Sequence, residues 1–425
     1  MSKVKTTLLP HSPEAVLTAA LPALAAIRKN QCSLDEYLDR CPLENILRRR
    51  LANLLFGYYR HAGKLTSSVQ SCCRKAPAPE LLDLLTAALA MAKLQDALPP
   101  ESVVNIAVTA AGKHFNPARK GFVNAVLRKA LIKFDQLSAP VLPPEIDRVW
   151  KKRFSAGVYQ YLTELFIQKP ANTLRLRSNY AMPQEAALTP LELELPWKFF
   201  RTDKLAEVIS GDAFQQGAFY IQDPAPAKVC SLLEKFHQLL PGTVRFIDLC
   251  AAPGGKLIMN MELLQMLNHT VKATALDRSE SRLKLVSENL QRCQLSARII
   301  SGDGAHTPQL QSEHFELVTC DVPCSNSGVF RRRPDALWRW RQADQPAITA
   351  LQQDILQNAA ALTAPGGLLL YSTCSLEPAE NEEIIAAFLK NSRHFQLLHS
   401  QLFMPDNDCD GTFAALLQKF PEAAQ

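Results

Sequence analysis

The sequence contains no run of about 18 apolar residues, the length that a helix needs to span a membrane. The apolar stretch Ala15–Ile27 is interrupted by Pro22 and followed by charged, patterned sequence, which favours an amphipathic helix over a secretion signal. Internal repeats and low-complexity tracts are also absent from the sequence, which argues against a solenoid. We therefore expect a globular, cytoplasmic protein with no membrane partner.

Motifs for metals and for nucleotide phosphates are missing as well. The eleven cysteines are scattered, and neither the adjacent Cys72 and Cys73 nor the isolated pair Cys320 and Cys324 has convincing zinc spacing. We expect reduced thiols and no metal. The dinucleotide fingerprint GxGxxG and the phosphate loop GxxxxGK[ST] do not occur after the predicted strands, which disfavours hydride transfer and nucleotide hydrolysis.

The length and net charge of the chain limit the number of domains and the kind of partner that we expect. A chain of 425 residues predicts two or three domains, and a hydrophobic share of 47% is ordinary for a globular core. The net charge of +6 points weakly to an anionic partner. No apolar heptads indicate an oligomer, so we expect a monomer.

The first third of the chain has helical periodicity throughout. Ser12 precedes Pro13 and Glu14, a good helix start, and Lys120–Phe134 places apolar residues near one helix face and basic residues around the rest. Those basic residues fit either a solvated face or a nucleic-acid surface. We predict an all-α domain over 1–137, a linker at 138–144, and a small α+β connecting region over 145–216.

From Val244 onward, short apolar strands alternate with helical stretches. This alternation is typical of a doubly wound parallel sheet. We predict an α/β, Rossmann-like domain over 217–425, with strands at Val244–Leu249, Val271–Leu276, Ala297–Ile300, Phe315–Cys320 and Gly367–Tyr371.

The ends of three successive strands carry acids beside a glycine-bearing turn. The segment CAAPGGK, Cys250–Lys256, follows the first strand, Asp277 ends the second and Asp303 follows the third. One such Asp is more often a helix cap than a ligand. Three of them beside a Gly-Gly turn favour a ligand with a ribose and no polyphosphate, and S-adenosylmethionine is the obvious candidate.

Two cysteines follow two strands of the same predicted sheet. Cys324 lies just beyond Phe315–Cys320, and Cys374 lies just beyond the strand that ends at Tyr371. Ligands bind at the carboxyl ends of strands in such sheets, so both thiols are expected in the crevice. Buried cysteines are usually core residues, and we accept that interpretation for the other strand and helix positions: Cys230, Cys250, Cys293 and Cys320.

Three long motifs resemble those of the RNA cytosine-5 methyltransferases, most of all the bacterial RsmB/Fmu-type ribosomal RNA branch. They are DLCAAPGGK from Asp248, DVPCSNSGVFRRRPD from Asp321 and STCSLEPAENE from Ser372. The helical region ending in KGFVNAVLRK resembles the NusB-like RNA-binding domain of that branch. The resemblance implies a class I S-adenosylmethionine-dependent methyltransferase domain after a NusB-like domain, acting on C5 of a cytosine in small-subunit (16S) ribosomal RNA.

The resemblance also implies roles for individual residues. Cys374 would add to C6 of the cytosine as the nucleophile, and Cys324 would assist release of the product. Asp321 would bond the exocyclic amine and N3 of the base, where a protonated carboxyl could donate a proton. The cofactor would be held by the loop residues and the strand-end acids: Cys250, Ala251, Ala252, Pro253, Gly254, Gly255, Lys256, Asp277, Asp303 and Asp321.

The segment FRRRPDALWRWR, Phe330–Arg341, combines arginines with tryptophans, as surfaces for single-stranded RNA do. Whether Trp338 and Trp340 meet RNA or enter the core stays open. The target base must be unpaired or flipped to reach a recessed thiol. We predict RNA contact for the five arginines of the segment: Arg331, Arg332, Arg333, Arg339 and Arg341.

Three other interpretations remain. Transfer RNA is the alternative substrate within the favoured class. A non-catalytic RNA-binding or ribosome-assembly protein with a decayed methyltransferase domain is disfavoured by the intact acids and cysteines. A protein or small-molecule methyltransferase would not need two thiols, and an NPPY-like loop is missing at Asp321–Cys324.

Overall fold

The structure, a computed structural model, describes residues 12–95, 98–137, 142–178, 180–181 and 188–421. It consists of two compact units, Met1–Lys169 with Phe330–Gln342, and Pro170–Val329 with Ala343–Gln425. The expected linker at 138–144 lies partly outside the described residues. The residues expected to connect the domains are divided between the units, because 145–169 folds with the first and 170–216 with the second.

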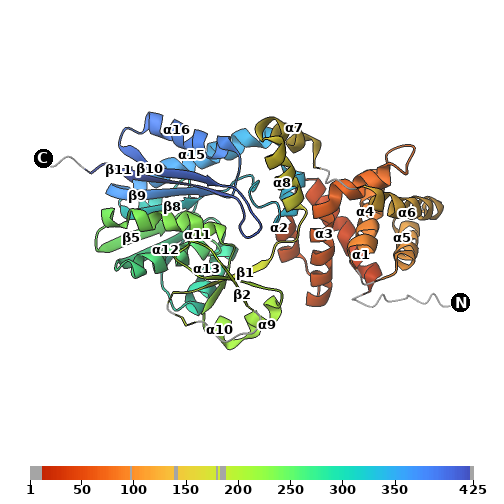
Figure 1. Cartoon of the computed structure of the whole chain (residues 1–425), viewed down its shortest axis with the longest axis horizontal. Coiled ribbons are helices and arrows are strands. Elements are labelled where there is room, and N and C mark those ends of the chain that lie inside the picture. Colours follow the sequence, from red (N-terminus) through yellow and green to blue (C-terminus); the bar gives the residue numbers. More distant parts are fainter. Residues whose placement is uncertain (1–11, 96–97, 138–141, 179, 182–187, 422–425) are drawn as a thin grey trace. The chain divides into compact units, whose positions relative to one another are not determined.

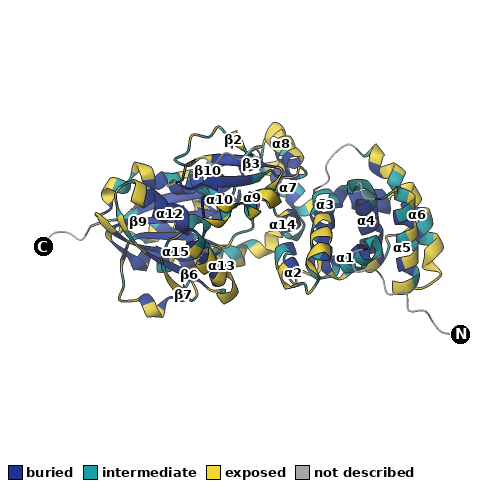
Figure 2. Ribbon diagram, turned by 90° about the horizontal axis from the view of Figure 1, so that it is seen from below, coloured by how far each residue is buried: buried dark blue, intermediate teal, exposed yellow. Residues whose placement is uncertain are grey.

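The first unit is helical, and one apolar core joins its helices between residues 13 and 136. Ser12 accepts a hydrogen bond from Ala15 N and caps the first helix, and Ser33 forms a capping box with Glu36. The central helix α4 is buried along nearly its whole length (Figure 2), as its run of apolar residues requires. The helices are α1 Pro13–Arg28, α2 Leu34–Arg40, α3 Asn45–Gln70, α4 Pro79–Leu94, α5 Pro100–His114, α6 Arg119–Gln136, α7 Pro144–Arg153 and α8 Ala156–Phe166.

A segment distant in sequence completes this unit. Helix α14, Pro334–Arg339, packs on α3, and Asp335 Oδ2 accepts a 3.0 Å hydrogen bond from Leu34 N at the start of α2. Trp338 Nε1 donates to Tyr59 O over 2.8 Å. These bonds satisfy a free helix-terminal N–H and an indole N–H, and so fix the segment to the helices.

The second unit begins with a small antiparallel sheet. Its strands run in the order β2-β3-β1-β4, followed in sequence by a short helix that leads into the larger sheet. The elements are β1 Asn172–Leu176, β2 Thr189–Leu191, β3 Phe199–Thr202, α9 Leu205–Ser210, α10 Asp212–Gln215, β4 Phe219–Ile221 and α11 Ala225–Cys230. Within the expected connecting region, residues 170–216 contain both strands and short helices.

The larger sheet has the order β10-β11-β9-β8-β5-β6-β7, with β9 to β7 parallel. Helices α12 and α13 cover one face and α15 and α16 the other (Figure 1), which confirms the predicted doubly wound sheet. The elements are β5 Thr243–Asp248, α12 Gly255–Met266, β6 Thr270–Asp277, α13 Glu280–Arg292, β7 Arg298–Ser301, β8 Phe315–Asp321, α15 Gln345–Leu362, β9 Thr363–Thr373 and α16 Glu382–Asn391.

Two antiparallel strands extend the sheet, and sequence analysis did not anticipate them. Strand β11, Thr412–Lys419, pairs with β9, and β10, Phe395–Phe403, pairs with β11 at the edge. Strand β10 pairs only with β11 among the described strands, and its polar residues Gln396, Ser400 and Gln401 are exposed.

The strand order reverses between β5 and β8, whose carboxyl ends therefore border the crevice where ligands of such sheets bind. In the described part of the chain, none of the helices has the length and apolarity needed to cross a bilayer. Nor do the described His, Cys, Asp and Glu side chains form a group of three that could hold a metal.

Candidate active site

The loop Cys250–Lys256 joins the end of β5 to the start of α12. Gly254 has a φ of +103°, a conformation that residues with a Cβ rarely adopt, and it lets the chain turn sharply into the helix. Asp277 binds this loop to the neighbouring strand, because its Oδ2 accepts from Ala252 N over 3.1 Å. The predicted cofactor loop thus lies against the acid that ends β6.

The three strand-end acids differ in their surroundings. Asp277 is buried and also accepts from Ser279 N, at the start of α13. Asp303 is exposed and accepts from Ala305 N, while Asp248 is buried and accepts from Cys250 N. Each carboxylate therefore supports a local turn, and Asp277 in addition joins β6 to the loop.

Asp248 has an unusual protonation equilibrium. Burial, and then repulsion by the Asp321 carboxylate, raise the pKa of Asp248 to about 7, although the Cys250 N–H and the Lys256 ammonium oppose the shift. This carboxyl lies directly beneath the loop, at the end of β5. The protonation of Asp248 therefore depends on the charges of Asp321 and Lys256.

Lys256 and Asp321 form an ion pair at the switch point. Lys256 Nζ lies 2.6 Å from Asp321 Oδ2, and Ser372 Oγ donates to Asp321 Oδ1 over 2.8 Å. Burial disfavours the charged form of Lys256, but the adjacent Asp321 carboxylate outweighs it, so the pKa of Lys256 rises above its ordinary value. Asp321 therefore accepts from donors on both oxygens and acts as a carboxylate in this arrangement.

The two predicted cysteines meet at the ends of adjacent parallel strands. In the pairing of β8 with β9, Asp321 lies opposite Ser372, and Cys324 and Cys374 follow directly in the chain. Their sulfur atoms are 3.0 Å apart, and Cys374 Sγ donates to Asn326 Oδ1 over 3.2 Å. Because the Cys374 proton points to Asn326, the Cys324 thiol is the donor between the two sulfurs.

The thiol of Cys324 holds its proton firmly. The hydrogen bond to Cys374, followed by burial, raises the pKa of Cys324 well above its usual range. The cysteines expected in the core differ in position: Cys230, Cys293 and Cys320 are buried among apolar side chains, and burial raises the pKa of each thiol. These three have the core environment that we predicted.

A buried network fixes the loop that carries Cys374, and sequence analysis missed its members. Thr373 Oγ1 donates to Asn381 Oδ1 over 2.6 Å, and Asn381 Nδ2 donates to Ser375 O over 2.9 Å. The fully buried Glu380 accepts from Ser325 N over 2.8 Å, which joins this loop to the one after β8. The polar residues of SLEPAEN, unusual beside an apolar strand, were the available signal.

Comparison with known proteins was decisive. A family model described as 16S rRNA methyltransferase RsmB/F matches residues 240–424, and the NusB family model matches residues 15–131. The ribosomal RNA small subunit methyltransferase B of Klebsiella pneumoniae (strain 342) is 31% identical over 321 residues, 71% of this chain and 71% of that protein. The chain belongs to the RsmB/F methyltransferase family.

Other members of this family align over different lengths. The small subunit methyltransferase B of Vibrio cholerae is 30% identical over 76% of this chain and 77% of that protein. The Vibrio vulnificus protein is 38% identical over 222 residues, where the chain spans half of that relative's length.

Solved structures show the same fold. The crystal structure of PH0851 covers 96% of this chain and 99% of its own, with a TM-score of 0.70 and 22% identity. NSun6 from Pyrococcus horikoshii, solved with SFG, covers 67% of this chain and 100% of its own, with a TM-score of 0.54 and 19% identity. The RsmB/F fold assignment therefore agrees with the predicted one.

The structure places the five predicted RNA-binding arginines in the helical unit, whereas the cysteines belong to the other unit. Arg331 is buried, and Arg339 bonds Asn30 and Asp335. Arg333 lies 3.6 Å from Asp35, and Arg341 bonds the carbonyl oxygens of Trp338 and Trp340. RNA contact stays a prediction for these arginines. Arg333 and Arg341 are exposed and therefore the most accessible to RNA.

The tryptophans of the same segment have packing roles. Trp340 is buried, and Trp338 is partly buried against the helical core. On helix α6, Lys120, Arg128 and Lys129 are exposed. Their exposure fits a solvated face and a nucleic-acid surface equally well.

Proposed function

We propose that this chain transfers a methyl group from S-adenosylmethionine to C5 of a cytosine in RNA, with small-subunit ribosomal RNA as the substrate. The observation that carries the proposal is the pair of thiols 3.0 Å apart, Cys324 and Cys374, at the ends of two adjacent strands. Beside them lies the Lys256–Asp321 ion pair. Membership of the RsmB/F family supports the same chemistry.

The residues around the loop Cys250–Lys256 fit the methyl donor. The loop offers backbone at a glycine turn and the start of a helix with no side-chain cap, and Asp277 offers a carboxylate at the end of the next strand. We propose that the loop residues, Asp277 and Asp303 hold the donor, with Asp321 at its reactive end. When bound, S-adenosylmethionine supplies an electrophilic methyl group.

The side chains of this protein activate the base. C5 of cytosine is a poor nucleophile. As the Cys374 thiol loses its proton and its Sγ bonds to C6, N3 takes up a proton and C5 becomes an enamine-like carbon that can accept the methyl group. The carboxylate of Asp321 accepts from the exocyclic amine, which favours cytosine over uracil. Protonation at N3 draws its proton from the Lys256 ammonium, which is bonded to the same carboxylate, and the negative charge of Asp321 favours the protonated base.

Release of the product uses the second thiol. After methyl transfer the C5 proton leaves to a base, the C5=C6 double bond re-forms and the bond from C6 to Cys374 breaks. The departing sulfur carries the electron pair, and the protonated Cys324 donates a hydrogen bond to it, as the distance between the two sulfur atoms allows. Its raised pKa suits Cys324 to this role of donor rather than nucleophile.

A methyl-transfer assay tests the proposal. The protein and Cys374→Ala are incubated with methyl-labelled S-adenosylmethionine and either unmodified small-subunit ribosomal RNA or a transfer RNA pool, and the labelled nucleoside is identified after digestion. We expect 5-methylcytidine in ribosomal RNA, absent with the variant. Label in transfer RNA alone would change the substrate, no label would favour a non-catalytic RNA-binding protein, and label with Cys374→Ala would refute the nucleophile.

A further inference from the structure

Gln222, just beyond β4, lies against the first residue of α12. Its backbone N–H continues the pairing of β4 with β1, donating to Thr173 O over 3.1 Å. A Cβ built on Gly255 would come within 2.8 Å of Gln222 Nε2, so a larger residue at the helix start would displace this amide from its present position. The small sheet thus brings an amide group to the cofactor loop.

The orientation of that amide is fixed by Arg175. Arg175 Nε donates to Gln222 Oε1 over 3.0 Å, and a guanidinium has donors only, so the oxygen of the amide must face the arginine. The amide nitrogen therefore faces Gly255. Among the described residues, no acceptor is bonded to this Nε2.

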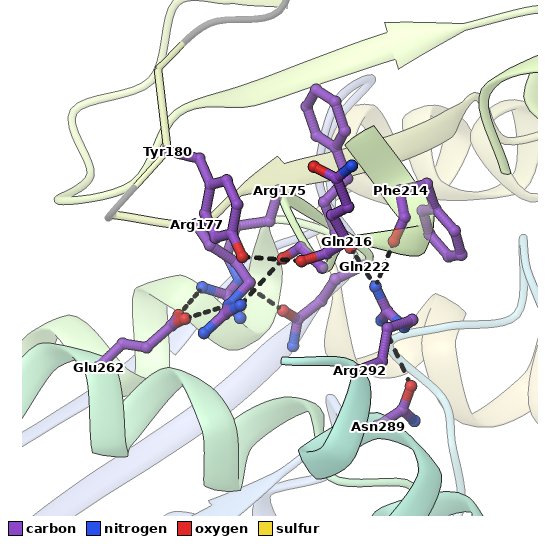
Figure 3. Close-up of polar contacts among 11 residues, drawn as sticks. Arg175, Arg177, Tyr180, Phe214, Gln216, Gln222, Glu262, Asn289 and Arg292 are labelled. Carbon is purple, nitrogen blue, oxygen red and sulfur yellow. Dashed lines mark hydrogen bonds and ion pairs between the residues drawn. The ribbon is translucent and has the colours of Figure 1, made fainter. Parts of the chain in front are cut away.

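Arg175 is itself held by a buried ion pair (Figure 3). It is fully buried on β1, and its Nη1 donates to Glu262 Oε2 of α12 over 2.5 Å. Arg177 Nε bonds the other oxygen of Glu262, so two guanidinium groups face one carboxylate. Such a pair is costly to move once buried, and it makes Arg175 a rigid support for Gln222.

Strand β4 is also fixed to α13 and to the loop. Arg292 Nη1 donates to Phe219 O over 2.8 Å, and Tyr220 OH donates to Pro253 O over 3.3 Å (Figure 3 shows Arg292). Asn289 Nδ2 donates to the same Pro253 oxygen over 3.0 Å. The strand that carries Gln222 is thus anchored on both sides of the glycine turn.

We propose that Gln222 donates its amide to the amino-acid carboxylate of the methyl donor, an inference that rests on the proposed function. An acid at the end of the second strand of such a sheet commonly bonds a ribose, which places the donor's ribose at Asp277. Its methyl group must face C5 of the base bonded to Cys374, which leaves the amino-acid end for the start of α12. There the helix N-terminus has no side-chain cap and favours an anion, and the buried arginine pair adds net positive charge. Gln222 is a binding residue that Arg175 positions.

Calorimetric titration of the full chain tests this role with three ligands: S-adenosylmethionine, S-adenosylhomocysteine and 5′-methylthioadenosine, which lacks the amino-acid end. Gln222→Ala loses a hydrogen bond to a charged group, so it should bind S-adenosylmethionine and S-adenosylhomocysteine roughly tenfold more weakly, or worse. Binding of 5′-methylthioadenosine should not change. Tyr180→Phe, which removes a hydrogen bond to Gln216 O from the same region, is the matched control and should bind all three as the unmodified chain does.

Gln222→Glu separates a ligand from a structural residue. It keeps an acceptor for Arg175, so a purely structural role predicts normal binding, whereas a carboxylate facing the donor's carboxylate predicts a larger loss than Gln222→Ala. Normal binding by Gln222→Glu, or an equal loss for all three ligands, would overturn the inference. So would a loss of RNA affinity alone, which would assign the amide to a phosphate.

The two proposals fail differently. A chain that binds S-adenosylhomocysteine through Gln222 but methylates no RNA would overturn the proposed function and leave the inference standing. A chain that methylates RNA with Gln222→Glu unimpaired would overturn only the inference. A chain that binds none of the three ligands would overturn both.

Discussion

The sulfur atoms of Cys324 and Cys374 lie 3.0 Å apart, although 50 positions separate the two residues in the chain. Strands β8 and β9 are adjacent and parallel, so their carboxyl ends deliver the two loops to the same point. Asn326 orders the pair, because it accepts the Cys374 proton and leaves Cys324 as the donor between the sulfurs. The two thiols are therefore inequivalent.

Replacing Cys324 should trap the covalent intermediate. In Cys324→Ala the sulfur leaving C6 lacks its hydrogen-bond donor, so the bond to Cys374 should form but break slowly. We expect a protein–RNA adduct that survives denaturing gel electrophoresis, dependent on S-adenosylmethionine. The double variant Cys324→Ala/Cys374→Ala is the control and should give no adduct. Equal amounts of adduct from the single and the double variant would contradict the role of Cys374 as nucleophile.

Asn381 should position Cys374 without touching substrate. It bonds Thr373 and Ser375, the two neighbours of the nucleophile, and is fully buried. Asn381→Ala should lower kcat by roughly 10- to 100-fold through misplacement of the thiol, with KM for RNA nearly unchanged. Asn124→Ala on helix α6, which belongs to the other unit, is the control. A change in KM with kcat intact would assign Asn381 to binding instead.

Stability should fall as pH rises through the titration of Asp248. Its folded pKa of about 7 exceeds the unfolded value of about 3.9, so the native state keeps a proton that the unfolded state releases between these values. The contribution of the Asp248 proton to the free energy of unfolding is complete below about pH 4 and is lost by about pH 7, a change on the order of 4 kcal/mol.

Asp248→Asn removes that titration. The free energy of unfolding, measured in urea from pH 5 to pH 8, should therefore rise for the variant relative to the unmodified chain as pH increases. Asp303→Asn serves as a control for loss of a strand-end carboxylate at an exposed position. Parallel curves for Asp248→Asn and the unmodified chain would show that Asp248 does not carry the effect.

Arg333 and Arg341 should contribute to RNA affinity through phosphate. Each substitution by alanine should weaken binding similarly for different RNA sequences and reduce the slope of log K against log salt by about 1. Arg245→Ala, on β5 and paired with Glu316, removes the same charge elsewhere and is the control. Unchanged slopes for both arginines would confine the segment to a packing role.

Sequence pattern was sufficient for the elements with one strong period. The strands from Val244 onward and the helices up to Phe134 were predicted because apolar residues repeat at two distinct periods. Strand β10 was missed, since an edge strand with exposed polar positions lacks a distinctive pattern. Strand β11 was missed although it is buried from Thr412 to Leu417 and lies between two strands. The network was missed because Glu380 bonds Ser325, which is distant in sequence, and because the direction in which the Asn381 side chain points depends on the fold of the loop.

The sequence by itself determined the type of each main element, the motif order and the two cysteines as candidates, because local periodicity and strand-end position are recorded in neighbouring residues. Only the tertiary structure decided which thiol donates to the other, that Asp321 is paired with Lys256, and that Phe330–Gln342 folds with the helices. It also brought Gln222 to Gly255. These relationships depend on how strands pair and which face a helix presents, and such non-local contacts form only when the chain packs.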